Sequence, residues 1–176
     1  VVFYNFSNAG KNSTDKIVGE FDQYKEVIVP TVKFVTNDDV VAAGENILSL
    51  YGFKNKPSLR EDVKINEEIQ KIFYSDQYVG VILKNTNSKF PYRIQVYDLN
   101  GNKKMEKEIK LEYDNVSFSG DNVLMYDDMN CQIISFDGVQ KFKVTFNGAV
   151  NAIIPIDGSR TFLIMTKSKI QKVKLK

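Results

Sequence analysis

The side chains of this sequence best suited to chemistry are carboxylates that flank short apolar runs. Glu67 and Glu68 stand side by side, Asp114 lies in the stretch LEYDN, and Asp127 and Asp128 lie in YDDMN. Two carboxylates on either side of a glycosidic bond are the machinery of most glycosidases, one acting as acid and the other as base or nucleophile. These residues predict a glycan-processing site if the fold pairs two of them, and ordinary solvated loop acids if it does not.

The turn YDDMN also carries the oxygen atoms that a calcium ion prefers. Asp127, Asp128 and Asn130 supply them, but Ca²⁺ takes about six to eight oxygen ligands from a regularly spaced loop, which this turn lacks. Asp and Asn are equally common in tight turns, because their side chains hydrogen-bond the nearby backbone. We therefore predict a hairpin turn here and no metal site.

Several catalytic and binding classes are excluded by composition. Histidine is absent and Cys131 is the only cysteine, which rules out Ser-His-Asp and Cys-His catalysis, His-ligated zinc and an internal disulfide. No phosphate loop, dinucleotide fingerprint or nucleophile elbow occurs, so we predict no cofactor. The net charge is only +2, and the basic stretches Lys54–Arg60 and Lys167–Lys176 lack interleaved stacking residues, which argues against a nucleic-acid partner.

Strands must position these residues, because helical periodicity is weak along the chain. Short apolar runs rich in Val, Ile, Phe and Tyr, broken by Asp, Asn or Gly, are typical of β-strands. An Asp-containing turn followed by an apolar strand recurs in VTNDDVVAAG, YSDQYVGVIL, SGDNVLMY and IDGSRTFLIM, at a spacing of roughly 40 residues that is typical of propeller blades. Four strands, named a to d, fit in each unit. The sequence thus predicts an all-β fold of propeller-type, four-stranded antiparallel blades.

The expected strands differ in chemistry according to their place in the unit. Strand b is almost continuously apolar, as in YVGVIL, which indicates burial on both faces. Strand c alternates: Ile94 and Val96 share one face, and Arg93, Gln95 and Tyr97 share the other. Strand d mixes apolar residues with charges, as in KMEKEIKL, and lysines there discourage edge pairing between molecules. We expect each blade to be apolar toward the centre of the ring, the hub, and charged at the periphery.

The repeat divides the chain into about four units. The expected ranges are 1–25 (partial), 26–66, 67–112, 113–148 and 149–176 (partial). The first partial blade resembles strands c and d, at Val1–Phe6 and Ile17–Phe21, and the last resembles a, b and c. Because the chain begins inside a hairpin, we expect a fragment of a longer polypeptide. It fits a segment of a ring of about seven or eight blades, a compact four-bladed ring, or half of a ring that a second copy completes.

In such a ring the b–c and d–a loops lie on one rim, where loops on a rigid scaffold carry function. The expected ligand-binding candidates on this rim are Glu67, Glu68, Tyr113, Asp114, Asp127, Asp128 and Asn130. Tyr24, Phe90 and Tyr92 lie near the same rim. Their rings could stack on a sugar or grip a peptide, but aromatic rings equally pack blade against blade.

The repeats resemble those of WD40-like and quinoprotein-like β-propellers, without the Trp-Asp and Gly-His landmarks. More narrowly, VVFYNFSN, VKFVTNDDVVAAGENILSLYGF and YRIQVYDLNG resemble an uncharacterised clostridial family. In that family one N-terminal membrane-spanning helix precedes a propeller-like domain outside the cytoplasm. The resemblance covers the whole chain, as the C-terminal half of such a protein. It implies a propeller fold, an extracytoplasmic location and a membrane anchor in the full-length protein, and it implies no known site residue.

The leading interpretation is a non-enzymatic binding or scaffold domain that recognises a protein or a cell-wall glycan through its propeller loops. One alternative is a carboxylate enzyme acting on a glycan, which neighbouring carboxylates of raised pKa would favour. Another is an assembly module, such as a homo-oligomer, whose exposed first and last strands pair with another chain. No catalytic residue is predicted.

Overall fold

The computed structural model describes residues 1–5, 16–24, 29, 31–54, 56–86, 89–110, 113–157 and 160–174. The elements that these residues form are β-strands, joined into antiparallel sheets. The predicted fold class, all-β with four-stranded antiparallel units, is confirmed. The expected strand ends at Phe6 and the boundary at residues 25–26 lie outside the described residues. Within the described ranges, no helix is long and apolar enough to cross a membrane.

Three of the sheets contain four strands each, arranged in chain order. The first contains β3 (Thr31–Phe34), β4 (Asp39–Ala43), β5 (Ile47–Gly52) and β6 (Ser58–Lys64). The second contains β7 (Ile69–Tyr74), β8 (Tyr78–Lys84), β9 (Tyr92–Asp98) and β10 (Lys103–Ile109). The third contains β11 (Asn115–Phe118), β12 (Asn122–Tyr126), β13 (Asn130–Ser135) and β14 (Gln140–Thr145).

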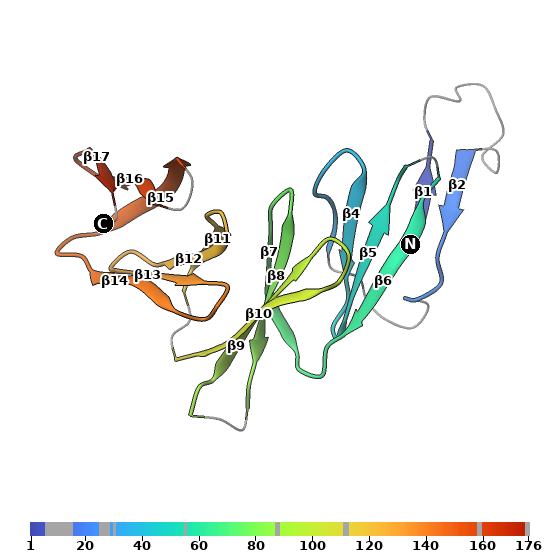
Figure 1. The fold of residues 1–176 in the computed structure, drawn as a ribbon, viewed down its shortest axis with the longest axis horizontal. Coiled ribbons are helices and arrows are strands. Elements are labelled where there is room, and N and C mark those ends of the chain that lie inside the picture. The colour runs from blue at the N-terminus through green and yellow to red at the C-terminus, as the bar shows by residue number, and fades with distance from the viewer. Residues whose placement is uncertain are drawn as a thin grey trace.

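A smaller sheet lies at each end of the described chain. One contains β1 (Val2–Tyr4) and β2 (Ile17–Glu20), and the other contains β15 (Val150–Asp157), β16 (Thr161–Thr166) and β17 (Ile170–Lys174). The five sheets follow one another along the long axis of the molecule (Figure 1). One sheet falls inside each of the five ranges expected from the repeat.

Each hydrophobic cluster is shared by two neighbouring sheets. Leu48 of β5 packs with Val81 of β8, and Ile94 of β9 packs with Val123 of β12. The next interface continues the pattern, since the cluster around Ile133 of β13 includes side chains of β15 and β16. Both faces of a middle sheet are therefore covered, and the core is divided among the sheet interfaces.

In the four-stranded sheets burial is greatest in the two central strands, which corrects the expected gradient from hub to periphery. Strands β8 and β9 are buried along most of their length, β10 is largely exposed, and β7, which adjoins β11 of the next sheet, is only half-buried. Gln95 and Tyr97 are 7% and 4% exposed, although they share a face of the strand with the charged Arg93. The β3–β6 sheet covers that face, where Tyr97 packs in a cluster with Leu48.

The β9–β10 and β13–β14 hairpins turn at glycine. Gly101 and Gly138 have φ angles of 87° and 79°, a conformation that side chains with a Cβ rarely adopt. In the first turn, Asp98 Oδ1 accepts the backbone N–H groups of Asn100 at 2.9 Å and Asn102 at 3.0 Å. Partial burial raises the pKa of Asp98, but hydrogen bonds from these asparagines and a neighbouring lysine outweigh it and lower the pKa to about 2. The repeated stretches VYDLNG and ISFDG thus form equivalent turns.

Candidate functional site

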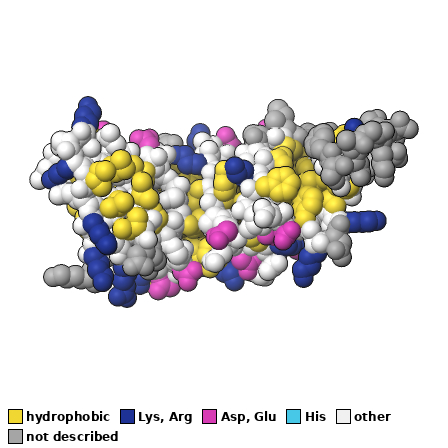
Figure 2. All heavy atoms as spheres, turned by 90° about the horizontal axis from the view of Figure 1, so that it is seen from above, with side chains coloured by type: hydrophobic (Ala, Val, Ile, Leu, Met, Phe, Trp, Pro, Cys, Tyr) yellow, Lys and Arg dark blue, Asp and Glu magenta, His cyan; other side chains and the backbone are white. Residues whose placement is uncertain are grey.

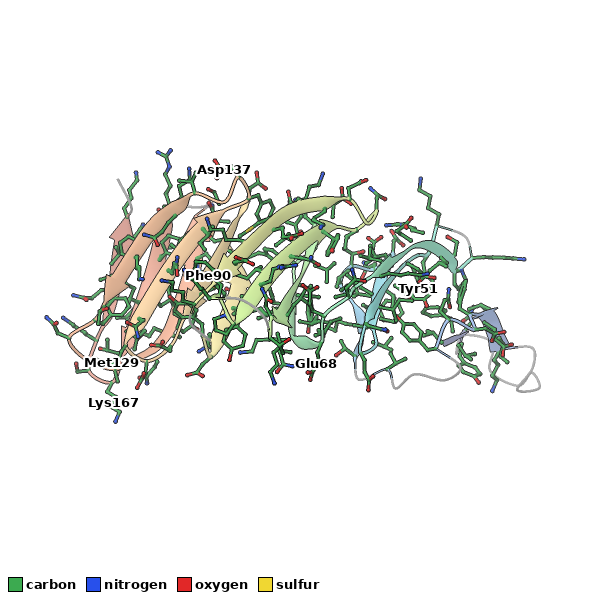
Figure 3. All side chains as sticks on the ribbon, turned by 90° about the horizontal axis from the view of Figure 1, so that it is seen from below. Tyr51, Glu68, Phe90, Met129, Asp137 and Lys167 are labelled. Carbon is green, nitrogen blue, oxygen red and sulfur yellow. The ribbon has the colours of Figure 1, made fainter. Side chains whose placement is uncertain are left out.

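The b–c turns and d–a connections lie along one long edge of the molecule. Glu68 between β6 and β7, Met129 between β12 and β13, and Lys167 between β16 and β17 all lie on this edge, whereas Asp137 between β13 and β14 lies on the opposite one (Figure 3). We name this edge the loop rim. The described residues of these turns and connections are 21–24, 29, 44–46, 65–68, 85–86, 89–91, 110, 113–114, 127–129, 146–149 and 167–169.

Backbone hydrogen bonds tie turns of the loop rim to the connections that follow them. The N–H of Ile65 donates to the carbonyl of Asn46 at 2.9 Å. Two sheets later the same pattern returns, since the N–H of Phe146 donates to the carbonyl of Met129 at 2.7 Å, and that of Val150 to the carbonyl of Asp128 at 2.8 Å. These bonds fix the rim backbone and involve no side chain.

A groove of about 600 Å³ opens on the loop rim between the β3–β6 and β7–β10 sheets. Residues 43–46 form one wall and residues 66–72 the other. Glu45 and Glu68 are exposed beside it. Lys71, on the same wall, donates from Nζ to the carbonyls of Tyr113 at 2.9 Å and Asp114 at 2.8 Å. The groove is thus edged by free carboxylates, and its lysine is held by the adjoining d–a connection.

A second groove, of about 440 Å³, lies further along the same rim. It runs between the connection Phe146–Val150 and the hairpin of β16 and β17. Its charged side chains are Lys167 and Lys169, both exposed, and Ile164 lines its floor. The described part of the rim therefore presents an acidic groove and a basic groove.

Glu67 is held in an ion-pair cluster that sequence reasoning missed. Arg93 Nη1 lies 2.6 Å from Glu67 Oε1, and the same guanidinium lies 3.7 Å from Glu106 and 3.5 Å from Glu108 on β10. A hydrogen bond from Lys103 lowers the pKa of Glu106. Arg93 was expected on a polar face of its strand, but a single sequence gives no sign that glutamates from two segments converge on it.

The YDDMN stretch forms a self-capped hairpin turn. Asp127 Oδ1 accepts the backbone N–H groups of Met129 at 2.7 Å and Asn130 at 2.6 Å. Partial burial raises the pKa of Asp127, but these hydrogen bonds outweigh it and lower the pKa. Asn130 Oδ1 accepts the Thr145 hydroxyl at 3.0 Å, and Asp128 is exposed. Across the described chain, no group of three or more His, Cys, Asp or Glu side chains is placed to hold a metal ion.

The tyrosines near the rim are packing residues, which corrects the expectation that Tyr113 faces a ligand. Tyr113 is 1% exposed, and its hydroxyl donates to Gln132 Oε1 at 3.0 Å. Tyr24 is also buried, and its hydroxyl donates to the Ala42 carbonyl and to Ser49 Oγ, each at 2.9 Å. Both rings fill space between sheets. Of the predicted ligand-binding residues, Glu68, Asp114 and Asp128 are exposed on the rim, whereas Tyr113 is not.

These tyrosines reveal a polar position that recurs in strand c. Opposite the fourth residue of each strand b stand Ser49, Gln95, Gln132 and Gln171. Ser49 donates to Asp62 on β6, and Gln95 accepts from the Tyr97 hydroxyl at 2.7 Å. Aligning the units through strand b would have exposed this repeat in the sequence, whereas reading one strand at a time assigns it to a solvent face.

With the fold and the rim described, the chain can be placed among known proteins. Residues 1–175 match the family described as "Family of unknown function (DUF5711)". The chain belongs to this family. No curated protein matches it.

The DUF5711 chain is similar to solved structures of β-propeller type. One is BamB from Moraxella catarrhalis, with TM-score 0.57 and 16% identity, covering 82% of this chain and 45% of that one. Another is Sqt1 from Saccharomyces cerevisiae, with TM-score 0.54 and 13% identity, covering 85% and 45%. A third is BBS1N in complex with ARL6DN, with TM-score 0.56 and 6% identity, covering 90% and 56%. The chain spans about half the length of these structures, and the likeness concerns the fold.

Proposed function

We propose that this domain is a protein-recognition scaffold whose loop rim contacts a polypeptide partner. The observation that carries the proposal is the rim itself, in which backbone-fixed turns flank grooves of about 600 and 440 Å³. A surface already held in its binding conformation loses little freedom on association, so more of the contact energy appears as affinity. Similar folds occur in BBS1N bound to ARL6DN and in a mitotic checkpoint complex, which are protein assemblies.

The charges of the rim indicate which charges a matching partner would carry. Glu45 and Glu68 edge one groove, while Lys167 and Lys169 edge the other. A partner segment with basic residues toward the first groove and acidic residues toward the second would match both ends of the rim. Charge complementarity of this kind sets orientation and association rate more than final affinity.

Two features favour a polypeptide over a sugar. Tyr113 and Tyr24, the tyrosines near the rim that were candidates for stacking on a sugar, are buried between sheets. In the described chain, each carboxyl group with a shifted pKa has it lowered, as in Asp98, Glu106 and Asp127. A glycosidase acid needs a raised pKa, so the geometry favours recognition over acid catalysis.

A photo-crosslinking amino acid placed at Glu68 or Met129 on the rim, and at Asp137 on the opposite edge, tests this proposal. The full-length protein carrying each probe is irradiated in its own cells. We expect a discrete crosslinked polypeptide from Glu68 and Met129, competed by the unlabelled domain and diminished by reversing Lys167 and Lys169 to glutamate. Equal products from Asp137, or retention of the domain on cell-wall glycan without a polypeptide adduct, would contradict it.

We also propose that the domain works outside the cytoplasm, attached to a membrane through a segment of the full-length protein. The support is the resemblance of VVFYNFSN and YRIQVYDLNG to the clostridial extracytoplasmic family. Protease added to intact cells should degrade the domain of the full-length protein. A domain protected until the cells are lysed would overturn this location.

A further inference from the structure

The outer side of the molecule carries two grooves between neighbouring four-stranded sheets. In Figure 1 the sheets fan around an arc, with β7 and β11 in contact toward its centre and β6 and β14 directed outward. The first groove, of about 420 Å³, lies between β6 and the β9–β10 pair. The second, of about 330 Å³, lies between β10 and the β13–β14 pair. Both walls of each groove belong to sheets that have all four strands.

The opposite side of the molecule, toward the centre of the arc, is a weaker guide to a partner. Phe34 and Tyr74 of the first strands are exposed there, and Figure 2 shows hydrophobic side chains gathered on this side. In a closed ring this side faces the other blades, which can cover it. The outer side faces away from them, so an uncompensated charge there calls for a separate occupant.

The strand register shows that the two outer grooves are equivalent. Gln95 lines the first and Gln132 the second, and both are the recurrent polar residue of strand c. Counted along strand d from the residue opposite that polar position, residues 63–66 correspond to residues 107–110. These two segments form the facing walls. The grooves can therefore be compared position by position.

The second groove is basic at three positions where the first is neutral or acidic. By register, these are Lys107 for Val63, Lys110 for Asn66 and Lys143 for Glu106. All three lysine side chains are exposed. On the aligned walls the one change of opposite sign puts Glu108 in the place of Lys64. The second groove thus carries an excess of positive charge that the first lacks.

The cations of the first groove are compensated within it, whereas those of the second are not. Arg93 lies 2.6 Å from Glu67, and Lys103 lies 2.5 Å from Glu106. Glu108, the acidic side chain among the described residues of the second groove, lies 3.5 Å from Arg93 of the neighbouring cluster. Within the described chain, no ion pair joins the three groove lysines to a carboxylate.

Phe90 gives the second groove an aromatic end and holds one of its lysines. Lys110 Nζ lies 5.3 Å from the centroid of the Phe90 ring, which is a cation–π distance. Phe90 lies set back from the edge that Glu68 and Met129 mark (Figure 3), so the groove runs from the loop rim onto the outer side. A half-buried ring beside ammonium groups suits an acidic peptide with an apolar side chain. A phosphate chain would use the charges alone.

We propose that this second groove, named the outer basic groove, binds an acidic segment of a partner polypeptide. It comprises Phe90, Lys107–Lys110, Gln132, Ile134 and Lys143. Carboxylates of the segment pair with the lysines, and an apolar side chain rests on Phe90. Several ion pairs are needed, because one exposed pair contributes little, and together they set the orientation of the segment. This surface goes beyond the proposed function of the loop rim and does not depend on the two grooves there.

Binding of two labelled peptides to the 176-residue chain tests the proposal by fluorescence anisotropy. The acidic probe is Gly-Glu-Asp-Leu-Glu-Glu-Gly, and the control probe has glutamine and asparagine in place of the acids. We expect the acidic probe to bind roughly tenfold more tightly or better, and to weaken as salt screens the charges. Equal binding of both probes, or no saturable binding of the acidic one, overturns the proposal.

Two double variants with the same change in net charge locate the binding. K107E/K143E reverses two groove lysines and should weaken the acidic probe by roughly tenfold or more, whereas K33E/K141E, outside the groove, should change it by less than about twofold. Circular dichroism checks each fold, and the two probes on the unaltered chain keep the test decisive if a variant folds poorly. Equal losses in both variants would mean that net charge alone attracts the probe, which overturns the proposal.

Two further titrations separate the partner polypeptide from other occupants. Linear polyphosphate of the same charge should displace the acidic probe less well than the unlabelled peptide, because it makes no use of Phe90. Equal or better displacement by polyphosphate overturns the choice of a polypeptide. The full-length protein, purified from its own cells, should bind the acidic probe as the 176-residue chain does. If the chain binds and the full-length protein does not, another part of the same protein occupies the groove, and the partner proposal is overturned.

Discussion

Gly80 of β8 stands opposite Phe73 of β7 in the antiparallel sheet, and the Phe73 ring lies against it. A Cβ added at Gly80 would lie 2.1 Å from Phe73 Cζ and 2.5 Å from Cε1. The ring has little room to retreat, since Phe73 is buried and its centroid lies 4.7 Å from that of Phe118. Overpacking of this kind costs about 1–3 kcal/mol, partly offset by about 0.4–1 kcal/mol from the stiffer unfolded chain. Gly80→Ala should therefore lose about 1–2 kcal/mol of folding free energy.

Urea unfolding followed by far-ultraviolet circular dichroism and tyrosine fluorescence measures this loss, which corresponds to a fall of roughly 2–4 °C in Tm per kcal/mol for a chain of this size. Gly148→Ala is the matched control, because nothing lies within 4 Å of a Cβ built there. Phe73→Leu should make room, so Gly80→Ala should cost less in that background. Equal stability of the Gly80→Ala and Gly148→Ala variants, or additive losses in the Phe73 cycle, would refute the reasoning.

Three further outcomes are expected. Ser49→Ala should lose about 1–3 kcal/mol in the same urea assay, because Tyr24 and the buried polar pairing around it lose a partner; an unchanged midpoint would contradict this. The pKa of about 2 for Asp98 lies below its ordinary value. The carboxylate of Asp98 therefore contributes about 2 kcal/mol to the free energy of unfolding, and this contribution should persist above pH 4 and disappear as the pH falls toward 2. In Asp98→Asn the free energy of unfolding should depend less steeply on pH between 4 and 2. Burial raises the pKa of Cys131 to about 12, so a thiol reagent at pH 8 should label it only after unfolding, and fast labelling of the native protein would argue against this.

The strands were predictable because their chemistry is local. Apolar runs such as YVGVIL and the Asp-Gly turns at Gly101 and Gly138 follow from period and turn chemistry within a few residues. The partial exposure of β7 was not predictable, because its burial depends on contacts with another sheet, such as those with β11. The burial of Tyr97 could not be predicted for a similar reason: it packs in a cluster with Leu48, which lies in a different sheet.

The candidate site divides in the same way. The turn of Asp127 and Asn130 could be interpreted correctly from sequence, because its hydrogen bonds join residues two or three apart. Tyr113 and Glu67 could not, because their partners Gln132 and Arg93 lie on other strands. A single sequence carries no record of such distant pairs.

The division of the core among sheet interfaces has a consequence for how the molecule opens. Each middle sheet packs against two neighbouring sheets and each end sheet against one. The folding free energy is then approximately a sum of one term for each sheet and one for each interface between neighbouring sheets. Fraying should start at β1–β2 and β15–β17 and progress inward, with amide hydrogens of β8 and β9 the last to exchange. A cut inside the β7–β10 sheet would remove support from both halves at once, whereas a cut beyond β14 would leave the four preceding sheets packed against one another.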